Sequence, residues 1–182
     1  MKLKKLKIKG AYEILPEPFK DSRGIFRRNF CMDEMKVFMK NEKIFQANLS
    51  FNQKKYTLRG FHYQLGKHAE GKLLTCLNGE IFDVLIDLRK NSPTYLKNEK
   101  IILSEKNMKS LFVPKGCANA FLTLKDKTFV HYYCTNRFYP KSENGIRYND
   151  PIVKAIWPKK PSVISNKDLS WKNYVSSPKK IL

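Results

Sequence analysis

The sequence predicts an all-β fold, an antiparallel sandwich or barrel, and three features of the chain support this expectation. Short runs rich in β-branched and aromatic residues follow one another, polar and apolar residues alternate within them, and turn-forming residues separate them. The turns include Asn78-Gly79, Ser92-Pro93, Pro114-Lys115-Gly116 and Tyr139-Pro140. With 42% hydrophobic and 13% aromatic residues among 182, the chain can bury the core of one domain.

The strands are predicted one after another along the chain. The β-rich runs cover residues 71–78, 79–89, 99–104, 110–113, 119–124 and 128–135. In the second run, apolar residues at 82, 84, 86 and 88 share one parity, and Asp83 and Asp87 share the other. This period of two predicts a strand that is buried on one face only.

One helix is predicted, from Asp33 as the N-cap to about Lys43. The apolar residues of this segment follow the helical spacing i, i+3, i+4, at Met35, Phe38 and Met39. From Pro158 onward the chain is rich in Pro, Ser and Lys, which predicts a C-terminal extension with one turn of helix. We therefore expect a single domain over residues 1–182, with a core at about 13–158 and an extension at 159–182.

The charge of the chain is strongly positive but not concentrated. Lys and Arg number 36 against 16 acidic residues, a formal net charge of +20. The basic residues are mostly Lys and are scattered along the chain, without an Arg stripe, zinc-finger spacing or an RNP-like motif. A solvated Lys-rich surface and a small anionic ligand therefore fit better than nucleic acid, which we do not expect as a partner.

The compartment is predicted from what the sequence does not contain. The basic N-terminal stretch is followed by no apolar segment of a secretory signal, and no apolar run is long enough to span a membrane. The four cysteines are widely spaced and form no CxxC pair. These observations predict a cytoplasmic protein with free thiols and no membrane partner.

The stretch LRGFHYQ, residues 58–64, contains one of only three histidines. On a regular strand, His62 and Gln64 share a face with Gly60, whereas Arg59 points to the other face. In a jelly-roll barrel the polar face can line the lumen, where such folds hold small ligands. His62 is therefore a candidate catalytic residue, although a core histidine with one satisfied hydrogen bond fits the same pattern.

Two other strands carry candidates on the parity expected to face the lumen. Lys72 opens the run at 71–78, and Tyr132 lies in the run at 128–135 with Val130 and Cys134 on its face. Together with His62, these residues would supply a base, a cation and an acid. From residue types alone, however, Tyr and Lys on strands more often form an amphipathic wall and a surface group than a catalytic set.

The motifs DSRGIF, LRGFHYQ, EGKLLTCLNGEIFDVLIDLRKNSPTY, FVPKGCANAF, YYCTNRFYP, GIRYNDP and IWP follow one another over residues 13–170. In their order and spacing the chain resembles the dTDP-4-dehydrorhamnose 3,5-epimerase family. The resemblance implies a cupin-like jelly roll, a double-stranded β-helix, to which the short N-terminal helix and the C-terminal extension predicted above are added. It also implies a homodimer that acts on nucleotide-linked 4-keto-6-deoxy sugars without a cofactor. A metal-dependent cupin is disfavoured, because His62, His68 and Glu70 lack the metal-ligand spacing.

The resemblance also implies catalytic roles. His62 would be the general base, and Asp168, after the WP motif, would orient its imidazole. Lys72 would stand against the oxyanion that forms at C4 of the sugar. Tyr132 would be the acid that returns a proton from the opposite face of the ring.

Further residues align with family positions that approach the substrate: Arg23, Phe26, Gln46, Arg59, Asn119 and Phe138. Three positions depart from the family pattern. Asn119 stands where a histidine is usual, and an amide can donate a hydrogen bond but cannot titrate. Arg28 replaces a common glutamate, and Phe138 replaces a ring-stacking tyrosine.

These departures leave alternatives open. One is an epimerase that inverts a single centre, C3 or C5, of a GDP- or CDP-linked 4-keto sugar or heptose. Another belongs to a different class, a catalytically idle barrel that only binds sugar nucleotides. Retention of His62, Lys72, Tyr132 and Asp168 together favours an enzyme, because a pure binder has no use for an acid opposite a base.

Overall fold

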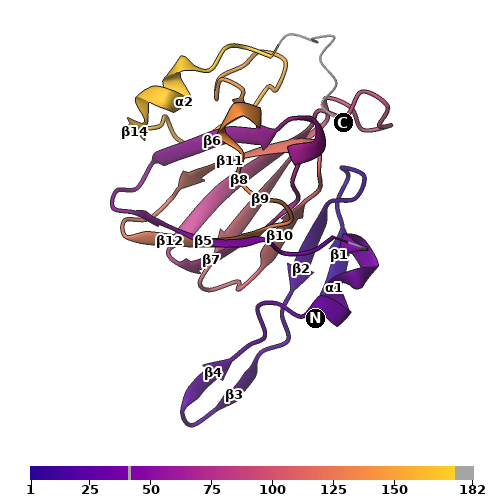
Figure 1. The fold of residues 1–182 in the computed structure, drawn as a ribbon. Helices are drawn as coiled ribbons and strands as arrows, with labels where there is room; N and C mark the ends of the chain where they lie inside the picture. Colours follow the sequence, from indigo (N-terminus) through magenta and orange to yellow (C-terminus); the bar gives the residue numbers. More distant parts are fainter. Residues whose placement is uncertain (41, 175–182) are drawn as a thin grey trace.

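The computed structural model describes residues 1–40 and 42–174, and within these ranges the strands form two large sheets and a small hairpin (Figure 1). The first large sheet has the order β1 (Lys2–Lys5), β2 (Tyr12–Leu15), β10 (Ser110–Val113), β7 (Lys72–Asn78), β12 (Thr128–Cys134), β5 (Gln46–Asn52). The second has the order β13 (Glu143–Gly145), β6 (Thr57–Gln64), β11 (Cys117–Thr123), β8 (Glu80–Asp87), β9 (Asn98–Ser104). Neighbouring strands on these paths are antiparallel, so the predicted all-β jelly roll is confirmed.

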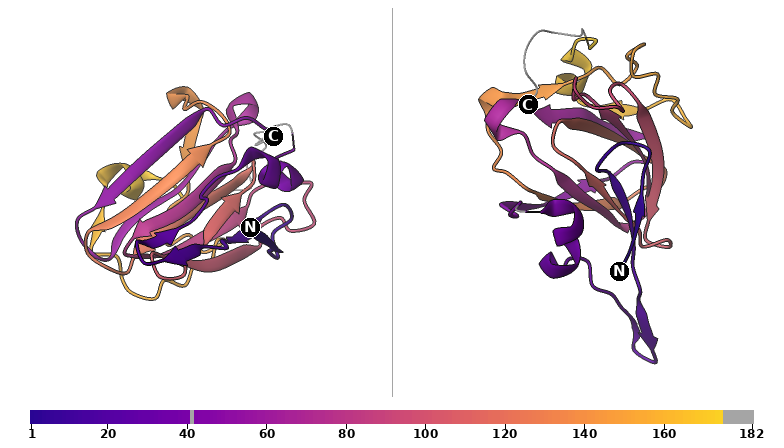
Figure 2. Two further views of the ribbon diagram at one scale, coloured as in Figure 1. Left: turned by 90° about the horizontal axis from the view of Figure 1, so that it is seen from below. Right: turned by 90° about the vertical axis from the view of Figure 1, so that its right-hand side faces the viewer.

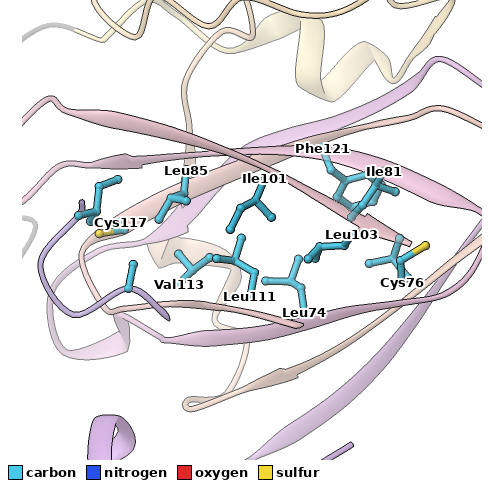
Figure 3. Packing of buried hydrophobic residues seen from close by; sticks show 13 residues of the cluster. Leu74, Cys76, Ile81, Leu85, Ile101, Leu103, Leu111, Val113, Cys117 and Phe121 are labelled. Carbon is cyan, nitrogen blue, oxygen red and sulfur yellow. The ribbon is translucent and has the colours of Figure 1, made fainter. Parts of the chain in front are cut away.

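The main core lies between the two large sheets (Figure 3). Leu74, Leu111 and Val130 come from the first sheet, and Leu85 and Leu103 come from the second. All five side chains are almost fully removed from solvent. Burial of each such side chain contributes about 1.5–3 kcal/mol, so this layer holds the two sheets together.

Strand β8 corrects one expectation from the sequence. We expected it to be buried on one face only, but Asp83 and Asp87 are both fully buried. Ile81 and Leu85, on the parity of Asp83, pack in the core between the sheets, while Val84 lies in a second cluster on the opposite face. The outer face of the sheet is covered by later parts of the chain, so both faces of β8 are internal.

Helix α1 (Met32–Met39) begins and ends earlier than predicted. Its N-cap is Cys31, and Asp33 lies inside the first turn, where its carboxylate pairs with Lys36 at 2.7 Å instead of capping. Lys40 adopts a φ of 51°, which ends the helix before Lys43. The predicted apolar face is confirmed, because residues 35, 38 and 39 pack in the third cluster of buried residues.

The chain between β2 and α1 forms a hairpin arm that projects away from the sheets, made of β3 (Phe19–Asp21) and β4 (Gly24–Phe26) (Figures 1 and 2). Every residue of both strands is exposed. Phe19 and Phe26 are 62% and 73% exposed, so the arm presents two large apolar side chains to solvent.

The C-terminal part of the chain runs back over β6. There, β14 (Val163–Ile164) pairs in parallel with β6, and α2 (Asn166–Ser170) follows it (Figure 1). The predicted helical turn is thus present, whereas the division into a core and an extension remains a prediction. Two short 3₁₀ turns lie earlier in the chain, η1 (Gly66–His68) after β6 and η2 (Pro140–Ser142) before β13. In the described residues, no helix is long and apolar enough to cross a membrane.

Candidate active site

A cavity with two lobes, of about 240 and 350 Å³, opens between the sheets, and His62, Lys72 and Tyr132 line both lobes. These residues come from β6, β7 and β12. The three residues that the sequence placed on lumen-facing strands therefore meet in one space.

His62 is held by an acidic partner far away in the sequence. Its Nε2 lies 2.5 Å from Oδ1 of Asp168, whose side chain is 4% exposed. Burial acts to raise the pKa of Asp168, but the hydrogen bonds with His62 and the Gly60 amide outweigh it, so the pKa lies below its usual value. An ionised Asp168 fixes the ring with Nε2 as the donor, which leaves Nδ1 to accept a proton.

The local fold around α2 explains how Asp168 reaches the histidine. Ser165 is the N-cap, and its Oγ accepts a hydrogen bond from the backbone N–H of Asp168 at 3.0 Å. Ser165 provides the cap of the helix, and the carboxylate of Asp168 binds His62 instead. The ring of Trp171 lies directly over Gly145 of β13, where an added Cβ would fall 2.3 Å from the indole. This close packing anchors the end of α2 beside His62.

Arg59 lines the same cavity as His62, so the prediction that it points to the opposite face is wrong. The pairing of β6 with β11 shifts register between Asn119 and Phe121, which changes the alternation of β6 at Gly60. Gly60 has a φ of +106°, and a Cβ there would lie 2.6 Å from the carbonyl oxygen of Asn119. Only glycine fits this position, which turns Arg59 toward the cavity, where its Nε donates to Asn52 at 2.7 Å.

Lys72 brings a largely buried positive charge to the cavity. Its side chain is 14% exposed, and its Nζ lies 3.6 Å from Oε1 of Glu70, which is also buried. The ammonium also donates to the backbone oxygen of His62 at 3.3 Å. Because an ammonium has three donors, these contacts leave it able to bind an anionic oxygen in the cavity.

Tyr132 has the orientation expected from strand parity. Val130, on its face of β12, packs in the main core, while Tyr133 packs in the third cluster on the outer side. Burial raises the pKa of Tyr132, so its phenol stays protonated at neutral pH. Among the residues that the structure describes, none forms a hydrogen bond with this hydroxyl, which leaves its proton available to a ligand.

Asn119 also lines the cavity, and its side-chain amide forms a hydrogen bond with a buried carboxyl group. Its Nδ2 donates to Oδ2 of Asp83 at 3.0 Å. Burial raises the pKa of Asp83 to about 7, although the hydrogen bond with Asn119 and the charge of Lys72 act in the opposite direction. Asp83 was not among the site residues predicted from the sequence. The sequence feature that could have identified it is its parity, which it shares with Ile81 and Leu85, two residues that face the core.

Two predicted binding residues lie at the mouth of the first lobe. The Oε1 of Gln46 accepts a hydrogen bond from the backbone N–H of Phe138 at 2.6 Å, and Phe138 is 50% exposed. Gln64 holds the same loop, because its Oε1 accepts from the N–H of Tyr139 at 2.6 Å. Other residues of this lobe were not selected from the sequence: Asn48, Glu70, Cys134 and Glu143.

Arg23 and Phe26 are not among the residues that line the cavity. Both lie on the exposed arm, where Arg23 pairs with Asp21 at 2.6 Å. Arg28, which follows the arm, pairs with Glu34 at 2.6 Å. Within one chain, the structure therefore does not bring these predicted substrate contacts to His62.

The described part of the chain contains no group of three or more His, Cys, Asp or Glu side chains placed to hold a metal ion. The cavity does contain a carboxylate-bound imidazole, a buried ammonium and a protonated phenol. Such a set can remove a proton from carbon, stabilise the resulting oxyanion and return a proton.

Comparison with known proteins gives one consistent result. A family model described as dTDP-4-dehydrorhamnose 3,5-epimerase matches residues 5–175. The chain is 38% identical to the dTDP-4-dehydrorhamnose 3,5-epimerase of Methanothermobacter thermautotrophicus, over 96% of this chain and 95% of that protein.

Solved structures agree with this relationship. The fold is similar to that of dTDP-4-dehydrorhamnose 3,5-epimerase from Bacillus anthracis with TDP and pyrophosphate bound, with a TM-score of 0.91, 31% identity and coverage of 95% and 99% of the two chains. It is also similar to a Legionella pneumophila dTDP-6-deoxy-D-glucose-3,5-epimerase in complex with dTDP-4-keto-L-rhamnose. That match has a TM-score of 0.89, 34% identity and coverage of 94% and 92%.

Proposed function

This chain belongs to the dTDP-4-dehydrorhamnose 3,5-epimerase family, and we propose that it inverts C3 and C5 of a dTDP-linked 4-keto-6-deoxy sugar. The observation that carries the proposal is the pairing of His62 with Asp168 at 2.5 Å, in a cavity that also contains Lys72 and Tyr132. Relatives with this family name and a structural neighbour with a bound dTDP-keto sugar support the choice of substrate.

The chemistry assigns one role to each of these residues. A ketone at C4 acidifies the hydrogens on C3 and C5, so Nδ1 of His62 can remove one and leave an enolate. The ammonium of Lys72 stabilises the negative charge on the C4 oxygen. The phenol of Tyr132 then gives its proton to the same carbon from the opposite face, which inverts the centre. Before the second centre reacts, the His62 imidazolium releases its proton to solvent and the Tyr132 phenolate takes up a proton from solvent, which restores the base and the acid.

Asp168 supports the base and does not touch the sugar. It holds the imidazole in the tautomer with a free Nδ1, and its charge stabilises the imidazolium that forms after proton uptake. Arg59 provides a guanidinium in the second lobe, which suits diphosphate oxygens. The amide of Gln46 and the ring of Phe138 border the first lobe, where they would contact the ligand.

Deuterium incorporation tests the proposed reaction. We expect the protein to place deuterium from D₂O at both C3 and C5 of dTDP-4-keto-6-deoxyglucose and to form the epimer, as detected by NMR. GDP- and CDP-linked 4-keto sugars serve as comparison substrates, and we expect the protein to place deuterium in them much more slowly. Deuterium at one carbon only would support the single-centre alternative, and no exchange with any of these sugars would support an idle binding barrel.

We propose that the protein works as a homodimer in which the arm of one subunit completes the cavity of the other. Arg23 and Phe26 align with substrate-binding positions but lie on an arm that projects from its own subunit. Strand β5 also has exposed apolar residues that border the second lobe of the cavity, Leu49 at 58% and Phe51 at 46%. β5 is an edge strand of the first sheet, so it has unpaired backbone groups. Apolar arms and an open edge are features that a second copy can cover.

Mixing two inactive variants tests this assembly. A double variant, Arg23→Ala with Phe26→Ala, and His62→Ala should each be nearly inactive alone. If the arm serves the partner, coexpression should restore about a quarter of the wild-type activity, because random pairing gives one complete cavity in half of the dimers. A stable monomer in light scattering with full activity would contradict the proposal, as would an absence of restored activity in confirmed heterodimers.

We also propose that the protein acts in the cytoplasm. Cys31, Cys76, Cys117 and Cys134 are all free thiols, which is usual in a reducing compartment. Expression with a fluorescent fusion in a host cell and fractionation would test this location.

A further inference from the structure

The Asp83 and Asn119 pair behind the cavity is not used by the proposed mechanism. Asp83 is fully buried on β8, and only its Oδ2 has a partner within the described residues. The unpartnered Oδ1 is unusual, because a buried carboxylate normally has hydrogen bonds to both oxygens. A protonated carboxyl accepts fewer hydrogen bonds than a carboxylate, and its O–H group is itself a donor.

The amide of Asn119 connects this carboxyl to the cavity. Its two ends have opposite polarity but nearly the same size, so a turn about the terminal torsion exchanges them with little change in packing. The structure shows the nitrogen end toward Asp83. The oxygen end is then left for the cavity, where it would repel the oxygen of an enolate.

We propose that Asp83 and Asn119 form a proton-controlled amide switch that sets whether the cavity receives a hydrogen-bond acceptor or a donor. With an ionised Asp83, the Asn119 nitrogen stays on the carboxylate and its oxygen faces the cavity. With a neutral Asp83, the carboxyl O–H donates to the Asn119 oxygen, and the NH₂ group faces the C4 oxygen of the substrate. The substrate side of this inference rests on the proposed function, whereas the switch itself is a property of the free protein.

The surroundings of Asp83 favour a change of protonation near neutral pH. On β9 its neighbours Ile101 and Leu103 are apolar, and burial raises the pKa of Asp83 to about 7. Lys72 on β7 is the charged group that acts on the carboxyl, and it favours the ionised form. The other titratable or charged groups that line the same lobe are His62 and Arg59 of β6 and Tyr132 of β12.

NMR of the free protein tests the switch without any substrate. With ¹³C-labelled aspartate, the signal that disappears in Asp83→Asn should titrate near pH 7. The side-chain amide signals of Asn119, assigned by their loss in Asn119→Ala, should move over the same pH interval. Asp87 is a matched control on the same strand, since hydrogen bonds with Arg89, Ser92 and Thr94 outweigh the effect of burial and lower its pKa to about 2. An Asp83 carboxyl that stays ionised from pH 5 to 9, or Asn119 signals that do not follow it, would overturn the proposal.

A double-mutant cycle tests the effect on the reaction. The C3 and C5 exchange rate of the wild type, divided by that of Asn119→Ala, should fall at least about tenfold between pH 6 and pH 9, because the donor to the oxyanion is lost. In the Asp83→Asn background the same ratio should not depend on pH. A ratio that is independent of pH in the wild type would refute the role of the switch in the reaction. If no variant exchanges hydrogen at all, the proposed function fails, and the NMR titration alone decides the switch.

Discussion

His62→Ala is expected to exchange hydrogen at C3 and C5 about 10³-fold more slowly than the wild type, while binding dTDP with unchanged affinity. The reason is that Nδ1 of His62 is the proposed acceptor of both protons, and the imidazole is not proposed to contact the nucleotide. Exchange rates in D₂O and the affinity for dTDP by calorimetry measure the two effects separately. Wild-type exchange in this variant would remove His62 from the mechanism.

Two further variants separate chemistry from folding. His62→Ala leaves the buried Asp168 without its partner, so thermal unfolding must show that the variant is folded. His62→Asn keeps a side-chain donor for Asp168 but has no titratable nitrogen, and it should be as slow as His62→Ala. Asp168→Asn keeps the base and loses only the charge that stabilises the imidazolium, so we expect a smaller loss, about 10- to 100-fold.

Tyr132→Phe is expected to separate hydrogen exchange from inversion. The base and Lys72 remain, so the variant should still wash deuterium into the substrate by returning it from the side of His62. Formation of the epimer needs a donor on the opposite face, and we expect it to fall about 10²-fold or more. NMR measures both outcomes in one experiment, as deuterium content and as the proportion of epimer.

The neighbouring Tyr133 provides the matched control for this variant. Its side chain packs against the third cluster, on the outer face of β12, where the ring of Phe30 lies tilted against it with 5.0 Å between the ring centroids. Tyr133→Phe should therefore form the epimer at nearly the wild-type rate. If Tyr132→Phe does so as well, Tyr132 is not the acid, and the assignment of the two ring faces is wrong.

Strand parity was sufficient to place Tyr132 and Lys72, because β12 and β7 are regular where these residues lie. The same reasoning failed for Arg59, since the register shift beside Gly60 exchanges the faces of β6 and leaves no clear mark in the sequence. It also failed for Asp83. Alternation predicts two faces for a strand but cannot tell which face lies between the sheets. In β8 the parity of Asp83 faces the core, and later parts of the chain cover the apolar parity of Val84.

Asp168 was predicted only through the family resemblance, because it lies 106 residues after His62 and belongs to a short turn of helix. No local pattern links two such distant segments. The contacts of Arg23 and Phe26 could not be predicted from one chain either, because the arm that contains them is exposed and lines neither lobe of the cavity in its own chain.

The position of a bound ligand tests the central claim most directly. A crystal structure of Tyr132→Phe with the dTDP-4-keto sugar should show the C4 oxygen within about 3.5 Å of the Lys72 ammonium. Nδ1 of His62 should face the hydrogens on C3 and C5, and residue 132 should lie on the opposite side of the ring. A sugar bound outside the cavity shared by His62, Lys72 and Tyr132, or one with its C4 oxygen turned away from Lys72, would contradict the account.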